Sequence, residues 1–206
     1  MEKGTIVFDL GGVIINLDVP RCVANFKKLM PEENIRNILG IDDEGEGIVA
    51  VSAATKQLMH DYEYGNISTD TFLNTLQEYC FPGTTIEQIR EAWLSMLDEL
   101  PQERLDFIAR LRKEGYRTVL LSNSNELHWD PIWEQYNLGS YFDHVFASHH
   151  LHMAKPNQDI FDHVVREAKI KEAVYVDDLE KNRKAGERFA GWQTVSSIED
   201  LKSLIP

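Results

Sequence analysis

Residues 5–13 read Thr-Ile-Val-Phe-Asp-Leu-Gly-Gly-Val and are the most informative segment of the sequence. Its first four residues form a short apolar run, which predicts a buried strand at 5–8. The run ends in Asp9, and Gly11 and Gly12 follow, which let the backbone approach a ligand closely. A carboxylate at the tip of a buried strand does not suit a core. It suits a nucleophile or a magnesium ligand.

Apolar runs at 118–121, 144–147 and 173–176, and a short stretch at 193–195, predict four more strands. They alternate with helical patterns and are rich in Val and Leu, which indicates a parallel sheet covered by helices on both faces. Ligands of such sheets bind at the carboxyl ends of the strands. We therefore expect an α/β fold with a Rossmann-like parallel sheet, and a site at that edge.

Between the first two strands the sequence predicts only helices. We expect one beginning at Asp18 with Pro20, one over 48–64, one capped at Ser68 or Thr69, and one opened by a capping box of Thr85 and Gln88. The expected organisation is a core domain of residues 1–16 and 100–206, interrupted by a small helical insertion at 17–99.

The 206 residues carry a formal net charge of −13, which argues against nucleic acid or an anionic membrane surface as a partner. A phosphorylated ligand must then be attracted by a local cation. The two cysteines, Cys22 and Cys80, lack metal-type spacing and indicate a reducing compartment. Neither a signal peptide nor a run of membrane-spanning length is evident, so we expect a cytoplasmic protein.

Polar side chains gather where the predicted strands end. Clustered carboxylates need a cation to stay ionised together, and Mg²⁺ is the natural one for oxygen ligands and phosphate. A carboxylate can also attack phosphorus, while a hydroxyl and an ammonium group hold the phosphate oxygens. The residues expected at this edge are Asp9, Ser122, Asn123, Lys155, Asp177 and Asp178.

Four segments, in this order, resemble the motifs of haloacid dehalogenase-like hydrolases. They are Ile-Val-Phe-Asp-Leu-Gly-Gly-Val around Asp9, Leu-Leu-Ser-Asn-Ser-Asn around Ser122, Lys155-Pro156, and Val-Asp-Asp ending at Asp178. The resemblance spans essentially the whole chain, and it implies that the helical insertion is the small cap of that superfamily.

The resemblance implies a role for each matching residue. Asp9 would be the nucleophile, Ser122 and Lys155 would be catalytic phosphate ligands, and Asn123 would bind substrate through its backbone or amide. Asp9, Asp177 and Asp178 would surround Mg²⁺, with the backbone carbonyl of Gly11 as a further ligand.

The chain departs from the usual phosphatase pattern at Gly11. Phosphatases of this superfamily usually carry at that position an aspartate that protonates the leaving oxygen and then activates water. The first motif instead resembles an Asp-Leu-Gly subgroup that includes bacterial glucose-1-phosphate-type phosphatases. A general acid contributes roughly two to four powers of ten in rate. Its loss is compatible with slow turnover, with a preference for good leaving groups, or with replacement by water or a substrate hydroxyl.

Several other polar residues have a plain structural interpretation that we favour. We expect an exposed loop at His149, His150 and His152 rather than a transition-metal site. His128 is either a substrate contact or a helix residue satisfied by the backbone. Glu63 and Tyr64 are hypothetical specificity contacts, although a solvated helix end is the favoured interpretation. The acidic run at 42–44 is expected to be an exposed loop.

The sequence thus predicts a Mg²⁺-dependent phosphatase that hydrolyses a small organic phosphate, such as a sugar phosphate, through an aspartyl-phosphate on Asp9. Two alternatives stay open: a 2-haloacid dehalogenase-type hydrolase, and a non-catalytic phosphate-binding or regulatory module that lacks the acid at Gly11. The paired carboxylates Asp177 and Asp178 speak against the dehalogenase, whose chemistry needs no metal. Substrate identity, pathway and oligomeric state are not evident from the sequence.

Overall fold

A computed structural model of the chain describes residues 3–39 and 53–205. Its centre is a five-stranded, wholly parallel sheet in the order β3-β2-β1-β4-β5. The strands are β1 (Gly4–Phe8), β2 (Tyr116–Ser122), β3 (His144–Ala147), β4 (Ala173–Val176) and β5 (Gln193–Val195). All five predicted strands are therefore present, and β2 extends beyond its predicted 118–121.

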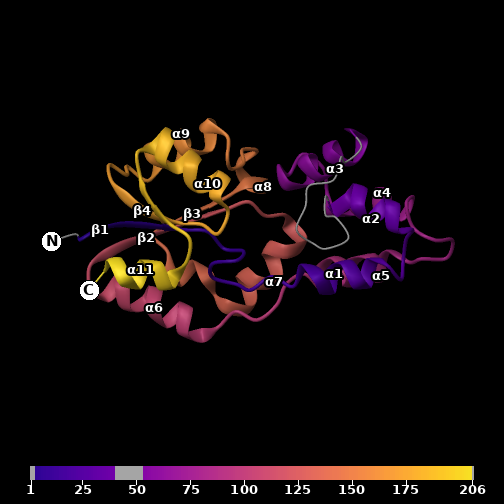
Figure 1. Cartoon of the computed structure of the whole chain (residues 1–206), viewed down its shortest axis with the longest axis horizontal. Coiled ribbons are helices and arrows are strands. Elements are labelled where there is room, and N and C mark those ends of the chain that lie inside the picture. The colour runs from indigo at the N-terminus through magenta and orange to yellow at the C-terminus, as the bar shows by residue number, and fades with distance from the viewer. Residues whose placement is uncertain (1–2, 40–52, 206) are drawn as a thin grey trace.

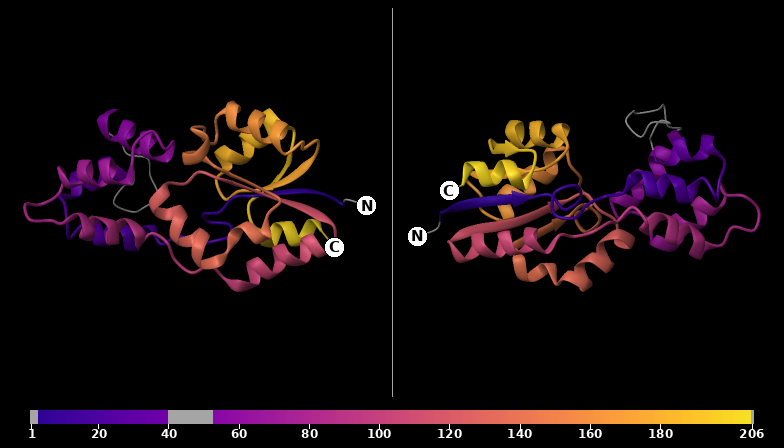
Figure 2. Two further views of the ribbon diagram at one scale, coloured as in Figure 1. Left: turned by 180° about the vertical axis from the view of Figure 1, so that it is seen from behind. Right: turned by 60° about the horizontal axis from the view of Figure 1, so that its bottom comes forward.

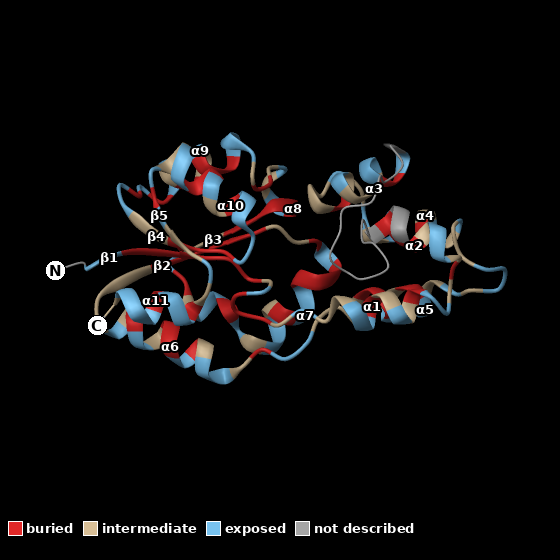
Figure 3. Cartoon of the chain, viewed as in Figure 1, coloured by how far each residue is buried: buried red, intermediate tan, exposed pale blue. Residues whose placement is uncertain are grey.

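Helices cover both faces of the sheet, because successive side chains of each strand point to opposite faces. Ile6 and Phe8 of β1 pack on one face against α6 (Gln102–Lys113), α7 (Glu126–Tyr136) and α11 (Ile198–Leu204). Val7 packs on the other face against α9 (Gln158–Glu167) and α10 (Glu180–Ala185). Figures 1 and 3 show the buried strands between these two helical layers. The short elements that complete this part are a 3₁₀ turn at Leu138–Tyr141, α8 (Ser148–Leu151) and a π-helical turn at Gly186–Ala190.

A separate group of helices follows β1, and we call it the helical segment. It comprises α1 (Val19–Phe26), α2 (Glu32–Leu39), α3 (Ala53–Glu63), α4 (Thr69–Gln77) and α5 (Ile86–Leu94). Its own apolar cluster includes Phe26, Phe72 and Trp93. It lies beyond the carboxyl ends of the strands, while both chain termini lie at the opposite end of the sheet (Figures 1 and 2).

The helix starts follow the predicted caps. The Asp18 side chain accepts from the backbone N–H of Arg21, Ser68 caps α4, and Thr85 forms the predicted capping box with Gln88. α2 was not predicted. The first part of the helix predicted over 48–64 and the run at 42–44 lie outside the described residues.

Two connections join the helical segment to the sheet, and they run side by side. The backbone N–H of Asn16 donates to Glu99 (3.0 Å), that of Asp98 donates back to Asn16 (3.0 Å), and that of Asp18 donates to Met96 (2.8 Å). We propose that the domain boundaries lie here, with a core of 1–16 and 100–206 and a cap of 17–99. Within the described residues, no helix is both long and apolar enough to cross a membrane.

Candidate active site

The predicted site residues converge at the carboxyl edge of the sheet because β1, β2 and β4 are adjacent. Phe8 pairs with Leu120 of β2 on one side and with Val176 of β4 on the other. The next residues along these strands therefore reach the same edge. Carboxylate oxygens of Asp9, Asp177 and Asp178 all lie within 4.8 Å of one another, although Asp9 precedes the other two by more than half of the chain.

Lys155 is the cation at this edge, and only 3% of its surface is exposed. Its ammonium group donates to Asp9 Oδ1 (2.9 Å), Asp177 Oδ2 (2.7 Å) and the carbonyl of Leu121 (3.0 Å). Burial lowers the pKa of Lys155, but the charges of Asp9 and Asp177 outweigh burial and hold the pKa above its usual value. The lysine therefore stays protonated between the two carboxylates.

The backbone at Lys155 is fixed by Asn123. The Asn123 amide donates to the Lys155 carbonyl (2.8 Å) and its side-chain oxygen accepts from the Lys155 N–H (2.8 Å). Ser122, at the end of β2, is buried, and its hydroxyl makes one long hydrogen bond, to the Asn123 carbonyl (3.3 Å). The two residues of the predicted second motif thus differ in role. Asn123 fixes the backbone at Lys155, whereas the Ser122 hydroxyl lies at the carboxyl edge of the sheet with one long hydrogen bond.

Asp9 has one carboxyl oxygen engaged and one open. Oδ1 accepts from the backbone N–H of Leu10 (2.7 Å) and from Lys155. Among residues 3–39 and 53–205, no hydrogen bond to Oδ2 is formed. Burial, together with the charge of Asp177, raises the pKa of Asp9 to about 7 despite the attraction of Lys155. An open oxygen on a fixed carboxyl group is the geometry that a nucleophile needs.

Asp177 is fully buried, and both its oxygens already accept hydrogen bonds. Oδ1 accepts from the Leu179 N–H (2.9 Å) and the Asn182 amide (3.1 Å), whereas Oδ2 accepts from Lys155, the Tyr175 hydroxyl and Asn182. This carboxylate is therefore held rigidly by protein donors. Its contacts suit an anchor for Lys155 more than a direct metal ligand.

Asp178 is exposed and lies against the loop after β1. A Cβ atom on Gly12, whose φ is +73°, would collide with the Asp178 carboxyl group, so only glycine allows this approach. Partial burial and the charge of Asp177 raise the pKa of Asp178. Asp9 and Asp178 present carboxylate oxygens only, a donor set that suits Mg²⁺ and is a poor one for softer metals.

Gly11 leaves space that an apolar side chain fills. A Cβ atom on Gly11 would stand 3.1 Å from Cδ1 of Leu17. The position at which related phosphatases carry their acid therefore faces a leucine here, and no proton donor can come from residue 11.

The histidine prediction was wrong in part. His149 and His150 lie in α8 rather than in a loop, and His149 is buried, which lowers its pKa to about 4. His150 and His152 are exposed, as expected. The error arose because four residues of Ser-His-His-Leu show no helical pattern, and because burial of His149 depends on helices far away in sequence.

His128 is a structural residue. It is buried, its ring contacts the Trp93 carbonyl (Nε2 to O, 3.0 Å), and the two rings stack with centroids 5.3 Å apart. Burial lowers the pKa of His128 to about 4, so the ring is neutral. His128 thus joins α7 to the helical segment, which agrees with the interpretation of a helix residue satisfied by the backbone.

Sequence reasoning undervalued Glu63 and Tyr64, which are docked on the core rather than solvated. The Ser148 hydroxyl donates to the Glu63 carbonyl (2.7 Å), and the Asn157 amide donates to the Tyr64 hydroxyl (2.7 Å). The signal available in the sequence was Gly65, directly after them. Its φ is +67°, and its backbone lies so close to the His149 carbonyl that a Cβ atom would collide with it.

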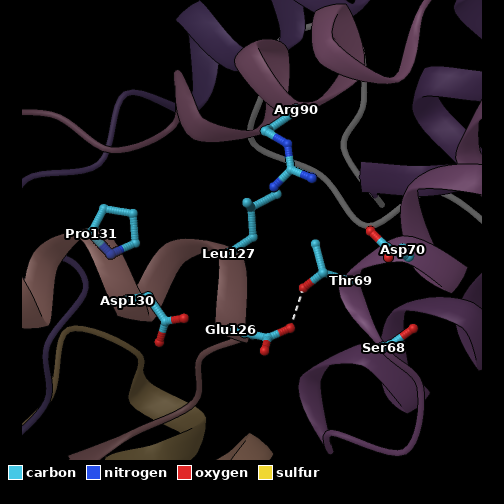
Figure 4. Close-up of a pocket in the computed structure, with 8 residues that line it drawn as sticks. All are labelled: Ser68, Thr69, Asp70, Arg90, Glu126, Leu127, Asp130 and Pro131. Carbon is cyan, nitrogen blue, oxygen red and sulfur yellow. Dashed lines mark hydrogen bonds between the residues drawn. The ribbon is translucent and has the colours of Figure 1, made fainter.

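A hollow of about 510 Å³ lies elsewhere, where α4 and α5 meet α7 (Figure 4). Its charged lining residues are Asp70, Glu126, Asp130 and Arg90, and Thr69 donates a hydrogen bond to Glu126 (2.5 Å). With three acids and one base, this surface repels an anion. It also includes none of the residues at the strand ends, so it is not the candidate site.

A parallel α/β sheet whose carboxyl edge gathers carboxylates, a buried ammonium group and a hydroxyl defines an α/β enzyme that binds an anionic ligand at the strand ends. The family model for haloacid dehalogenase-like hydrolases matches residues 3–189. The chain belongs to this family, which confirms the resemblance of its four motifs.

Individual relatives agree with this assignment. The chain is 31% identical to D-ribitol-5-phosphate phosphatase of Bacteroides thetaiotaomicron over 197 residues, covering 92% of this chain and 89% of that protein. A crystal structure of a HAD family enzyme of the same organism, in complex with magnesium and inorganic phosphate, is similar with a TM-score of 0.77 and 31% identity, covering 98% and 99% of the two chains. A HAD-like family hydrolase from Porphyromonas gingivalis gives a TM-score of 0.80 at 30% identity, covering 98% and 97%.

Proposed function

We propose that this protein is a Mg²⁺-dependent phosphatase that acts on a small sugar or polyol phosphate. The observation that carries the proposal is Lys155, buried between Asp9 and Asp177 at the strand ends, with Asp178 close by. A relative that covers most of the chain is a D-ribitol-5-phosphate phosphatase, and a similar structure holds magnesium and phosphate together.

The proposed reaction has two steps. The open oxygen of Asp9 attacks phosphorus and forms an aspartyl-phosphate, and water then hydrolyses it. Lys155, the Ser122 hydroxyl and groups at Asn123 hold the phosphate oxygens as charge shifts in the transition state. Asp177 keeps Lys155 in place.

Asp9, Asp178 and the Gly11 carbonyl would hold Mg²⁺, with Asp177 behind them as the support of Lys155. The ion would supply positive charge that screens the approach of one anion to another. Of the two predicted metal ligands Asp177 and Asp178, this assignment makes Asp178 the direct ligand. Both oxygens of Asp177 already accept hydrogen bonds from protein donors.

Hydrolysis of p-nitrophenyl phosphate tests the proposal. We expect release of p-nitrophenol that needs Mg²⁺, stops with EDTA and is abolished in Asp9→Asn. A panel that includes D-ribitol 5-phosphate and glucose 1-phosphate then ranks substrates by kcat/KM. Phosphate binding without turnover in the presence of Mg²⁺ would contradict the proposal and favour a non-catalytic module, and turnover of a 2-haloacid without metal would favour the dehalogenase.

A further inference from the structure

A phosphatase site needs a proton donor for the leaving oxygen, and residue 11 cannot supply it. Gly11 has no side chain, and Leu17 occupies the space next to it. A protein donor, if the site has one, therefore belongs to another element near the strand ends.

The end of α3 is held against this edge of the core. The Glu63 carbonyl accepts from Ser148 (2.7 Å), the Tyr64 carbonyl contacts the His152 ring (2.7 Å to Nδ1), and Gly65 packs on the His149 backbone. Figures 1 and 2 show α3 beside α8. These contacts involve the backbone of Glu63 and do not use its carboxyl group.

The Glu63 carboxyl group lies beside the Asn123 amide and within reach of the charge of Lys155. Asn123 in turn is locked to the Lys155 backbone by two hydrogen bonds of 2.8 Å. Glu63 therefore lies at the carboxyl edge of the sheet, near the Lys155 ammonium group that contacts Asp9. The helical segment thus contributes a carboxyl group to this edge.

The direction of the reaction also points to this side. In an in-line displacement the leaving oxygen stands opposite the attacking oxygen. Asp9 lies at the strand end, so the leaving group points away from the sheet, toward the helical segment (Figure 1). A donor carried by α3 is on that side.

The surroundings of Glu63 favour its protonated form more than water does. Burial raises its pKa above the usual value, against the opposing effects of Lys181, the Asn123 amide, Lys155 and His60. A carboxylic acid next to a phosphate site avoids the repulsion that a carboxylate would suffer.

We propose that Glu63 is the general acid and base of the reaction, and this rests on the proposed phosphatase function. As Asp9 forms its bond to phosphorus, the ester P–O bond breaks, its electron pair goes to the leaving oxygen, and that oxygen takes the proton of Glu63. In the second step the Glu63 carboxylate accepts a proton from water, whose oxygen bonds to phosphorus. The bond to Asp9 then breaks, and free phosphate and protonated Glu63 result.

Glu63→Gln tests the proposal with two leaving groups. With a sugar or polyol phosphate found active for the wild type, we expect kcat to fall roughly 10²- to 10⁴-fold. With p-nitrophenyl phosphate, whose leaving group needs little protonation, we expect the first turnover to release p-nitrophenol at close to the wild-type rate. Steady turnover should then slow, because the aspartyl-phosphate lacks its base.

Controls separate this role from others. Glu78→Gln, an exposed residue at the end of α4, should leave both rates unchanged, and the urea midpoint of Glu63→Gln should equal that of the wild type because the α3 contacts use its backbone. Equal losses of the first-turnover rate on both substrates, or a change in KM alone, would overturn the proposal in favour of substrate binding. If the wild type cleaves neither ester with Mg²⁺, the phosphatase function itself fails, and the role of Glu63 falls with it.

Discussion

Replacing Lys155 by Met should destabilise the protein strongly, because the substitution removes a buried charge and keeps the length of the side chain. The ammonium group makes three contacts, to Asp9 (2.9 Å), Asp177 (2.7 Å) and the Leu121 carbonyl (3.0 Å). Without it, two buried carboxylates stand close together with no cation between them. The structure therefore predicts a loss far larger than that for a surface lysine.

The size of the loss follows from the burial of the pair. Removing one partner of a buried ion pair costs roughly 3–5 kcal/mol, because the other charge stays behind unpaired. With a urea m-value of about 2–3 kcal/mol/M, the midpoint should fall by roughly 1–2 M. The pKa of Asp9 is already raised to about 7, and loss of Lys155 raises it further. Protonation of Asp9 at pH 5 removes one of the two charges, so the loss should be smaller at pH 5 than at pH 8.

Urea unfolding in EDTA at pH 8 and pH 5 measures this prediction. Lys184→Met is the matched control, since its ammonium group pairs with Glu180 (2.8 Å) on the surface and both side chains are about 70% exposed. That variant should leave the midpoint unchanged. A fall of less than about 1 kcal/mol for Lys155→Met at pH 8, with an unchanged m-value, would refute the buried pairing.

Three further predictions concern other residues of the site and its supports. Asp9→Asn should abolish turnover and, without Mg²⁺, should be more stable than the wild type at pH 8. The folded-state pKa of Asp9 (about 7) is above its usual value of 3.8, so its ionisation opposes folding as the pH rises from 4 through 7. The two unfolding curves should therefore converge near pH 4. Asp178→Asn should weaken Mg²⁺ affinity, measured by calorimetry. The loss should exceed the roughly 10- to 100-fold that is typical of residues that support metal ligands without contacting the metal. Unchanged affinity would contradict the role of Asp178 as a ligand. Gly65→Ala should lower the urea midpoint more than Gly83→Ala. Both glycines have positive φ (+67° and +91°), but of the two only Gly65 would also bring a Cβ atom into collision with neighbouring backbone. Equal effects would contradict the close approach of α3 to α8.

The sheet was predictable because most of its strands are short runs that are apolar on both faces. The predicted strands at 144–147, 173–176 and 193–195 coincide with β3, β4 and β5, and β1 differs by one residue. α2 was missed because Glu32–Leu39 is mostly polar; among its described side chains, Ile35 and Ile38 are buried. Sequence patterns thus report elements that bury much of their own surface, and they miss elements that depend on neighbours.

The site was predictable in its membership and less so in its internal roles. Parallel strands bring their carboxyl ends to one edge, so Asp9, Ser122 and Asp177 had to meet once the strands were recognised. Which partner each side chain chooses depends on loops whose course no local pattern specifies. The sequence predicted Lys155 as a phosphate ligand. The structure adds that the Lys155 ammonium group pairs with both Asp9 and Asp177.

The charges at the strand ends explain why this edge needs a divalent cation. Asp9, Asp177 and Asp178 contribute −3 when ionised and Lys155 contributes +1, which leaves −2. Without a metal, part of this charge is relieved by protonation, and the raised pKa values of Asp9 and Asp178 express that tendency. Mg²⁺ would bring the sum to zero and displace the proton from Asp9, which turns this residue into the ionised nucleophile. In this acidic protein, cation binding and activation of the attacking carboxylate are therefore one event.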